Sequence, residues 1–189
     1  MFLKLAQQRR TVYQFTDEPV EDELVLTCLN AAIWAPNHKL TEPWRFYILG
    51  SQTQEALKQT YAGLRADKRA EPGSAEYQAI FEKACERFLA YPKIVLVGQK
   101  RSDDPIKSKE DYAACACAIQ NFQLMAWELG LGVQWSTGPI IQDSRTYQTL
   151  EIDASEIELI GILYMGYPQP QCLTNQKRRP INDVSRFYG

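Results

Sequence analysis

The chain of 189 residues has a single histidine, three methionines and five cysteines, and none of the cysteines forms a C-x-x-C pair. One imidazole without a neighbouring cysteine or carboxylate pattern is a poor metal site, and no G-x-S-x-G motif accompanies it. Cys115 and Cys117 are two positions apart, so on a helix their side chains point in different directions. The odd number of cysteines favours free, buried thiols in a reducing compartment. We therefore expect neither a metal centre nor a disulfide framework.

The sequence also lacks a long apolar segment and a glycine-rich phosphate loop. The run "LIGILYMG" at 159–166 is too short to cross a bilayer, and "MFLKLAQQRR" at 1–10 has no sustained apolar stretch typical of a signal peptide. Neither a Walker motif nor a G-x-G-x-x-G turn is present. We expect a cytoplasmic protein without membrane contact, in which side chains hold any phosphate.

Positive charge is scarce but unevenly placed. The formal net charge is −2, which argues against a general nucleic-acid or anionic-membrane surface. Five of the 21 basic residues lie in two short foci, Arg9-Arg10 near one end and 177–179 near the other. Two small basic foci on an acidic background suit one compact anion better than a polyanion.

The hydrophobic pattern predicts helices that alternate with strands, which indicates an α/β layered domain spanning residues 1–189. The segment 93–99 is apolar on both faces and is expected to be a central strand. The segment 110–129 is apolar nearly all round, which indicates a helix buried on most sides. Helices are expected at 2–10, 21–34, 52–65, 74–91 and 110–129, and strands at 44–49, 93–99, 133–137 and 158–168.

Four segments occur in an order and at separations that resemble a known family. They are "RRTVYQF" at 9–15, "AAIWAPNHKLTEPWRFYIL" at 31–49, "GLGVQW" at 130–135 and "KRRPINDV" at 177–184. Each motif alone is weak, but the ordered set is similar to the FMN-dependent nitroreductase family. The histidine after Ala-Pro-Asn and the short chain resemble a compact bacterial subgroup of that family.

The resemblance implies an α+β fold with a central mixed sheet of four to five strands flanked by helices. It also implies an intertwined homodimer with two FMN sites at the subunit interface, and a C-terminal arm, 169–189, that packs on the partner. In such a protein NADH or NADPH reduces FMN, and the electrons then pass to a nitroaromatic or quinone-like small molecule by ping-pong chemistry.

The family motifs carry over to ten residues of this chain that are expected to contact FMN. Arginine binds a phosphate bidentately and a hydroxyl adds a donor. An imidazole on a loop held by two prolines offers a polar contact, and a carboxylate accepts from ribityl hydroxyls. The ten are Arg9, Arg10, Thr11, His38, Glu42, Trp135, Ser136, Thr137, Lys177 and Arg179.

Alternatives accompany these assignments. Arg9 and Arg10 also fit a solvated helix C-terminus, and Trp135 also fits an ordinary buried strand end. Many family members carry a basic residue where this chain has Tyr13, which brings no charge. No side chain stands out as a general acid, which is consistent with a flavin that supplies the difficult chemistry. The same scaffold also suits a flavin-binding or sensing protein without turnover, another reaction such as flavin fragmentation, dehalogenation or dehydrogenation, or a structural dimer without flavin.

Overall fold

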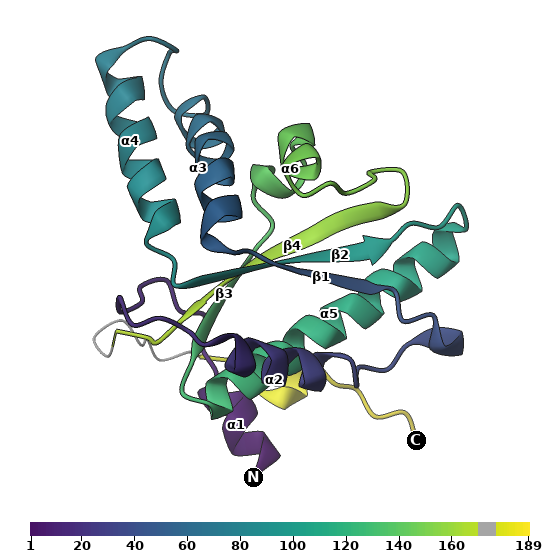
Figure 1. Ribbon diagram of the computed structural model, residues 1–189. Helices are drawn as coiled ribbons and strands as arrows, with labels where there is room; N and C mark the ends of the chain where they lie inside the picture. Colours follow the sequence, from purple (N-terminus) through teal and green to yellow (C-terminus); the bar gives the residue numbers. More distant parts are fainter. Residues whose placement is uncertain (170–176) are drawn as a thin grey trace.

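The computed structural model describes residues 1–169 and 177–189 (Figure 1). Every helix and strand predicted from the sequence is present, with ends that differ by a few residues. Its helices are α1 (Phe2–Gln8), α2 (Asp22–Ala32), α3 (Ser51–Ala66), α4 (Ala75–Leu89), α5 (Pro105–Glu128) and α6 (Ser144–Thr149). Its strands are β1 (Trp44–Ile48), β2 (Lys93–Lys100), β3 (Gly132–Ser136) and β4 (Ile157–Gly166). Short 3₁₀ turns lie at His38–Leu40, Pro139–Ile141 and Ile181–Asp183.

Helix α5 begins five residues before the predicted start. The Asp104 side chain accepts hydrogen bonds from the backbone N–H groups of Ile106 and Lys107, at 2.9 and 3.3 Å. Pro105 follows as the first helical residue, where its missing N–H costs nothing. The Asp-Pro pair is therefore the signal for the start of the helix, although the apolar periodicity begins later.

In the described part of the chain, no helix combines the length and the hydropathy needed to span a membrane.

The sheet has the order β1-β2-β4-β3, and all three strand pairs are antiparallel. The four strands therefore form an antiparallel sheet instead of the expected mixed sheet. Two helices connect β1 to β2, which returns the chain to the same end of the sheet and reverses its direction. The β2-α5-β3 crossover does give two parallel strands, but β4 lies between them. A parallel pairing occurs only as the isolated bridge of Thr11 with Val133 within the described residues.

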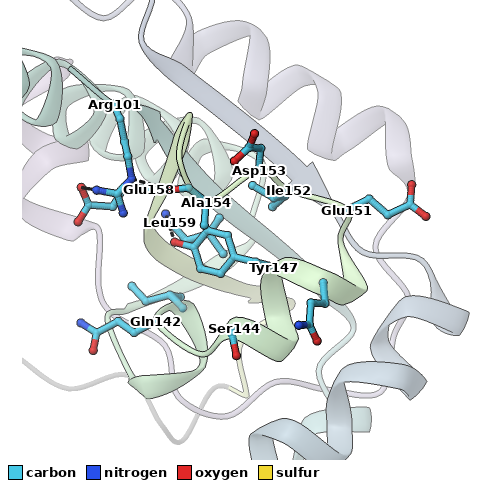
Figure 2. A pocket seen from close by; sticks show the side chains of 12 residues that line it. Arg101, Gln142, Ser144, Tyr147, Glu151, Ile152, Asp153, Ala154, Glu158 and Leu159 are labelled. Atoms are coloured by element: carbon cyan, nitrogen blue, oxygen red, sulfur yellow. Dashed lines mark hydrogen bonds and ion pairs between the residues drawn. The ribbon is translucent and has the colours of Figure 1, made fainter. Parts of the chain in front are cut away.

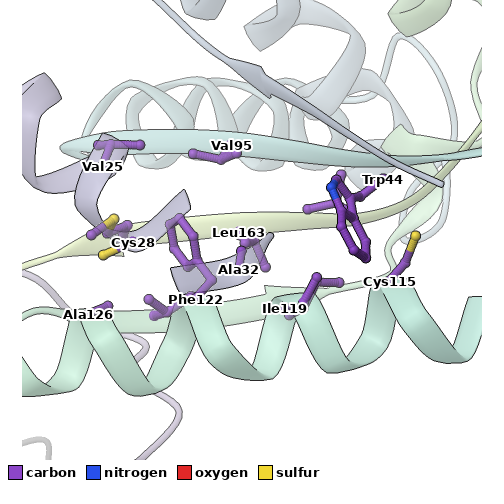
Figure 3. Close-up of a cluster of buried hydrophobic side chains, with 14 of the residues drawn as sticks. Val25, Cys28, Ala32, Trp44, Val95, Cys115, Ile119, Phe122, Ala126 and Leu163 are labelled. Carbon is purple, nitrogen blue, oxygen red and sulfur yellow. The ribbon is translucent and has the colours of Figure 1, made fainter. Parts of the chain in front are cut away.

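Side chains of the two inner strands alternate between two cores, one on each face of the sheet. On one face, Val95 and Leu163 pack against α2 and α5 (Figure 3). On the other face, Leu96 and Ile162 pack against α3 and α4, which project together from the sheet (Figure 1). Burial on both sides confirms that 93–99 is a central strand.

The cysteines of the first core behave as small apolar side chains, as expected. Burial raises the pKa of the Cys28 thiol to about 12, and that of Cys115, which also lies near Asp111, to about 12. Cys117, two residues further along α5, is exposed. All four described cysteines are free, and no cluster of metal-binding side chains occurs among the described residues.

Gly130 and Gly132, at the junction of α5 and β3, meet two different structural requirements. Gly130 follows the end of α5 with φ of +79°, a conformation that favours glycine. Gly132 lies against Val12, and a Cβ at Gly132 would be 2.7 Å from the Val12 Cβ. The segment after α1 therefore approaches the start of β3 more closely than a side chain at position 132 would allow.

We expect Gly132→Ala to lower the free energy of unfolding by about 1–3 kcal/mol, because the new methyl group overlaps Val12. Urea unfolding measures the change. Gly63→Ala in α3 is the matched control, since a Cβ there meets nothing within 4 Å. This control is expected to raise stability by about 0.4–1 kcal/mol. Equal changes for the two variants would contradict the close approach.

Candidate functional site

The segment that follows α1 brings Arg9 to the side of α5 and the start of β3. Thr11 forms a bridge with Val133, and the Arg9 Nη1 lies 3.5 Å from the Oε1 of Gln123 on α5. The Nε of Arg9 is buried and has no hydrogen-bond partner among the described residues. A buried donor without an acceptor is costly, so this group is suited to a ligand that supplies one.

Arg9 lies among other cations. Burial lowers the pKa of its guanidinium below the usual value, and the nearby charges of Arg178 and Arg10 lower it further. Such a group of like charges destabilises the protein unless an anion neutralises it. The donor set and its charge therefore fit a phosphate.

Arg10 also takes the alternative role considered from the sequence. Its Nη1 donates to the carbonyl of Gln7 and, at 2.9 Å, to that of Arg9. These carbonyls belong to the C-terminal end of α1, where cations are favourable. Arg10 thus caps α1 and contributes its charge to the same region.

The second basic focus reaches Arg9 through a residue that the sequence-based assignment left out. Lys177, Arg178 and Arg179 are all exposed, and residues 170–176 of the expected arm, 169–189, lie outside the described residues. Arg178 is close enough to act on the pKa of Arg9. The sequence placed Lys177 and Arg179 on the phosphate by their spacing, and that spacing alone did not identify Arg178.

The end of β3 presents its side chains to the two faces of the sheet in alternation. Trp135 packs on the α5 side, and its Nε1 is buried without a partner among the described residues. Gln134 and Ser136 face α3 and α4, and the Gln134 Oε1 is likewise buried and unpaired. The Ser136 Oγ accepts from the Gly138 N–H at 3.3 Å, while Thr137 is exposed.

Gln134 and Ser136 open on a cavity of about 250 Å³ between β3 and the α3-α4 pair. It is rich in tyrosine and contains two arginines, but no carboxylate is among its described lining residues. These residues are Tyr13, Tyr61, Leu64, Arg65, Arg87, Tyr91, Gln134, Ser136, Gly138, Pro139, Ile140 and Tyr164. The cavity therefore favours a flat, polar ring with a negative edge.

His38 lies on a different part of the surface, against the N-terminal half of α5. Its Nδ1 is 2.7 Å from Oε2 of Glu110, so in neutral imidazole the proton on Nδ1 donates to the carboxylate. In that form the Nε2 is an acceptor. Beside it, the Thr41 hydroxyl donates to the buried Asp111 at 2.7 Å.

The loop that carries His38 is strained. Lys39, Leu40 and Glu42 have φ values of 53°, 52° and 42°, which are uncommon for residues other than glycine. Side-chain contacts hold the loop, since the Glu42 N–H donates to the Asn37 Oδ1 at 3.0 Å. Strain of this kind is typical of loops that are shaped for a ligand.

Within one chain the two groups of predicted residues do not meet. Glu110 and Gln123, which contact His38 and Arg9 respectively, are 13 residues apart on α5. At 1.5 Å per residue this is a separation of about 20 Å. Figure 1 shows the same arrangement, with α1 near one end of α5 and the 38–41 turn near the other. The structure thus brings together Arg9, Arg10 and Thr11, and leaves His38 and Glu42 apart from them.

A larger cavity, of about 620 Å³, lies between α6 and the sheet (Figure 2). Its chemistry does not suit a phosphate. The Arg101 side chain is already engaged, with Nε donating to the Ala154 carbonyl at 2.8 Å and Nη1 lying 3.7 Å from Glu158. Glu151 and Asp153 add negative charge to its described lining, which contains none of the ten predicted residues.

The nitroreductase family model matches residues 6–167. The chain belongs to the nitroreductase family. It is 34% identical over 181 residues to "Putative NAD(P)H nitroreductase YfhC" of Bacillus subtilis strain 168, covering 95% of this chain and 90% of that protein. A nitroreductase-like family protein from Bacillus cereus has a TM-score of 0.83 at 30% identity, covering 100% and 96% of the two chains. A structure from Desulfovibrio desulfuricans, described as a putative nitroreductase in complex with FMN, shares the fold with a TM-score of 0.75 at 24% identity, covering 99% and 96%.

We expect Thr41→Val to lower the free energy of unfolding by about 1–3 kcal/mol, because it leaves the buried Asp111 carboxylate without its hydroxyl donor. Thr27→Val is the matched control, since the Thr27 hydroxyl donates only to a carbonyl of its own exposed helix turn. Its effect is expected to stay within about 0.5 kcal/mol. Coincident urea transitions for the two variants would show that Thr41 does not anchor the loop.

Proposed function

We propose that the protein is an FMN-dependent oxidoreductase that passes electrons from NADH or NADPH to nitroaromatic or quinone-like acceptors. The observation that carries this proposal is the partly buried Arg9, with an unpaired Nε and two neighbouring cations, beside the strand that leads to the tyrosine-lined cavity. Phosphate at Arg9 and a planar ring toward the cavity match the two halves of FMN. Family membership and the FMN-bound neighbour of the same fold support this choice of ligand.

In this proposal FMN supplies the transfer of a hydride and the storage of two electrons. Arg9, with the charges of Arg10 and Arg178, would bind the FMN phosphate, whose charge is about −1.5 to −2. The Thr11 hydroxyl adds a donor next to it. Ser136 and Thr137 would orient the ring edge, and Trp135 would pack beneath the strand that carries them. No described side chain of the cavity is a carboxylic acid or an imidazole, so water is the proton source in this scheme.

A second copy of the chain completes the site. The His38 loop and the Arg9 group are about 20 Å apart in one subunit, so both contact one FMN only if they come from different subunits. Large apolar side chains that are exposed to solvent in a single chain support such an assembly, because soluble monomers rarely expose large apolar patches. They include Phe2, Trp34 and Leu40, with exposures of 70%, 84% and 81%, and Phe187 and Tyr188 in the C-terminal arm, at 96% and 89%. A two-fold dimer would bury these residues and bring Glu42 and the Nε2 of His38 to the ribityl chain of the partner's FMN.

The visible spectrum of the purified protein tests the function. A flavin spectrum is expected that bleaches with NADH or NADPH under anaerobic conditions and recovers when nitrobenzene is added. Arg9→Gln is expected to weaken FMN binding by about 1.5–3 kcal/mol, or roughly 10- to 150-fold, while the urea midpoint of the apoprotein does not fall, because the variant removes one of three neighbouring cations. The exposed Arg69→Gln is the control and should leave FMN affinity unchanged. Bound flavin that neither donor reduces would favour a sensing role, and a colourless protein would reject the proposal.

The assembly is tested separately. Replacing Phe187 and Tyr188 with serine is expected to raise the dimer dissociation constant and to release FMN at the same time, since the arm would lose its apolar contact with the partner. Leu89→Ser removes an apolar side chain of 41% exposure from α4, which is not assigned to the interface, and serves as the control. Sedimentation velocity combined with flavin absorbance reports both properties. A stable monomer that carries FMN would contradict the shared site.

A further inference from the structure

Two arginines of the tyrosine-lined cavity have no role in the phosphate contacts described above. Arg65 comes from α3 and Arg87 from α4, and both line the cavity beside β3. Neither forms an ion pair with a carboxylate in the part of the chain that the structure describes, 1–169 and 177–189. No carboxylate is among the described residues that line the cavity, so the lining itself does not neutralise the two charges.

Tyrosine hydroxyls hold both guanidinium groups in place. The Arg65 Nη1 donates to the Tyr61 hydroxyl at 3.0 Å, and the Arg87 Nε donates to the Tyr91 hydroxyl at 3.1 Å. The Arg65 guanidinium also lies 5.2 Å from the centre of the Tyr61 ring. Tyr61 and Tyr91 are only 5% and 6% exposed, so the hydroxyls that position the cations are themselves fixed by the core.

The lining of the cavity also includes the polar side chain of Gln134 and the uncharged side chain of Tyr13. The Gln134 Oε1 is buried, unpaired among the described residues, and lies on the strand that lines the cavity. Tyr13 lines the same cavity as Arg87, and both also line an adjoining depression of about 320 Å³. Tyr13 follows the phosphate-binding Thr11 by two residues, which places it about 7 Å further along an extended chain. A ligand held by its phosphate at Arg9 would therefore direct its ring toward Tyr13 and Arg87.

Reduction creates negative charge on that ring. Hydride transfer from NADH or NADPH delivers two electrons and one proton to FMN and leaves NAD⁺ or NADP⁺. Without a second proton, the reduced ring is an anion whose charge lies along the N1 and C2-carbonyl edge. A cation next to this edge stabilises the reduced form of FMN more than the oxidised form, and this difference raises the reduction potential.

We propose that Arg87, with Arg65 beside it, faces this edge of FMN and supplies the positive charge that Tyr13 does not bring. Tyr91 acts as a positioning residue, since its hydroxyl accepts the hydrogen bond that holds Arg87. The assignment rests on the proposed function and specifies how this chain sets the potential of its flavin. It places the determinant on the α3-α4 pair, outside the segments that carry the family motifs.

The test compares the midpoint potential and the affinity for oxidised FMN in the full-length holoprotein. Arg87→Gln is expected to reduce the preference for reduced over oxidised FMN by about tenfold, which corresponds to a potential lower by about 30 mV for a two-electron couple. Tyr91→Phe is expected to shift the potential in the same direction by a smaller amount. Lys83→Gln is the matched control, because Lys83 is an exposed cation on the same helix that does not line the cavity.

A double variant distinguishes the loss of positive charge at position 87 from a structural effect of the substitution. Adding Tyr13→Lys to Arg87→Gln is expected to restore the potential, since the new ammonium group enters the same cavity. Failure of this rescue, or an unchanged potential in Arg87→Gln, would overturn the assignment while the wild-type protein still binds and reduces FMN.

Binding of an anionic electron acceptor by the two arginines predicts a different result for Arg87→Gln. If the two arginines instead bind an anionic acceptor, Arg87→Gln will keep the wild-type potential but lose its affinity for 4-nitrobenzoate relative to nitrobenzene. That outcome overturns the assignment. A wild-type protein without FMN would reject the proposed function and this inference together, whereas the potentials of the variants decide the inference alone.

Discussion

The close approach of Val12 to Gly132 is the contact on which the candidate site depends. It joins the segment after α1 to the start of β3, and thereby places Arg9 beside α5 and Tyr13 beside the cavity. The contact is possible only because position 132 has no side chain, while Gly130 turns the chain out of α5 with its positive φ. The two glycines of "GLG" thus serve the architecture of the site.

The sequence predicted the secondary structure well because the relevant signals are local. The continuous apolar run within 93–99 and the apolar face of 21–34 are properties of each segment alone. The antiparallel order of the sheet was not predicted, because it follows from where β4 inserts, and no local pattern in 158–168 specifies a neighbour. The start of α5 at Pro105 was within reach, since Asp104 and Pro105 are a recognisable helix start.

The same distinction applies to the candidate site. Motif order identified Arg9 and Thr11, which the structure brings next to β3. It did not identify Arg65 or Arg87, because these lie on helices whose sequence shows only ordinary amphipathic character. Their relevance depends on the packing of α3 and α4 against the end of β3, which is a property of the folded chain. Likewise, His38 pairs with Glu110, which is 72 positions away, so no local pattern around the histidine specifies this partner.

In the proposed site charge placement would control the chemistry, because no described residue of the tyrosine-lined cavity is a carboxylic acid or an imidazole. The charges of Arg10 and Arg178 act on Arg9, so in the proposed site these three residues would favour binding of phosphate whatever the redox state of the ring. Arg65 and Arg87 lie on the other side of β3, where only the ring would reach them. Charges near the phosphate therefore bear mainly on affinity, and charges near the ring bear mainly on the potential. The two groups belong to different parts of the chain, the segment after α1 with 177–179 and the α3-α4 pair, so affinity and potential would be separable by substitution.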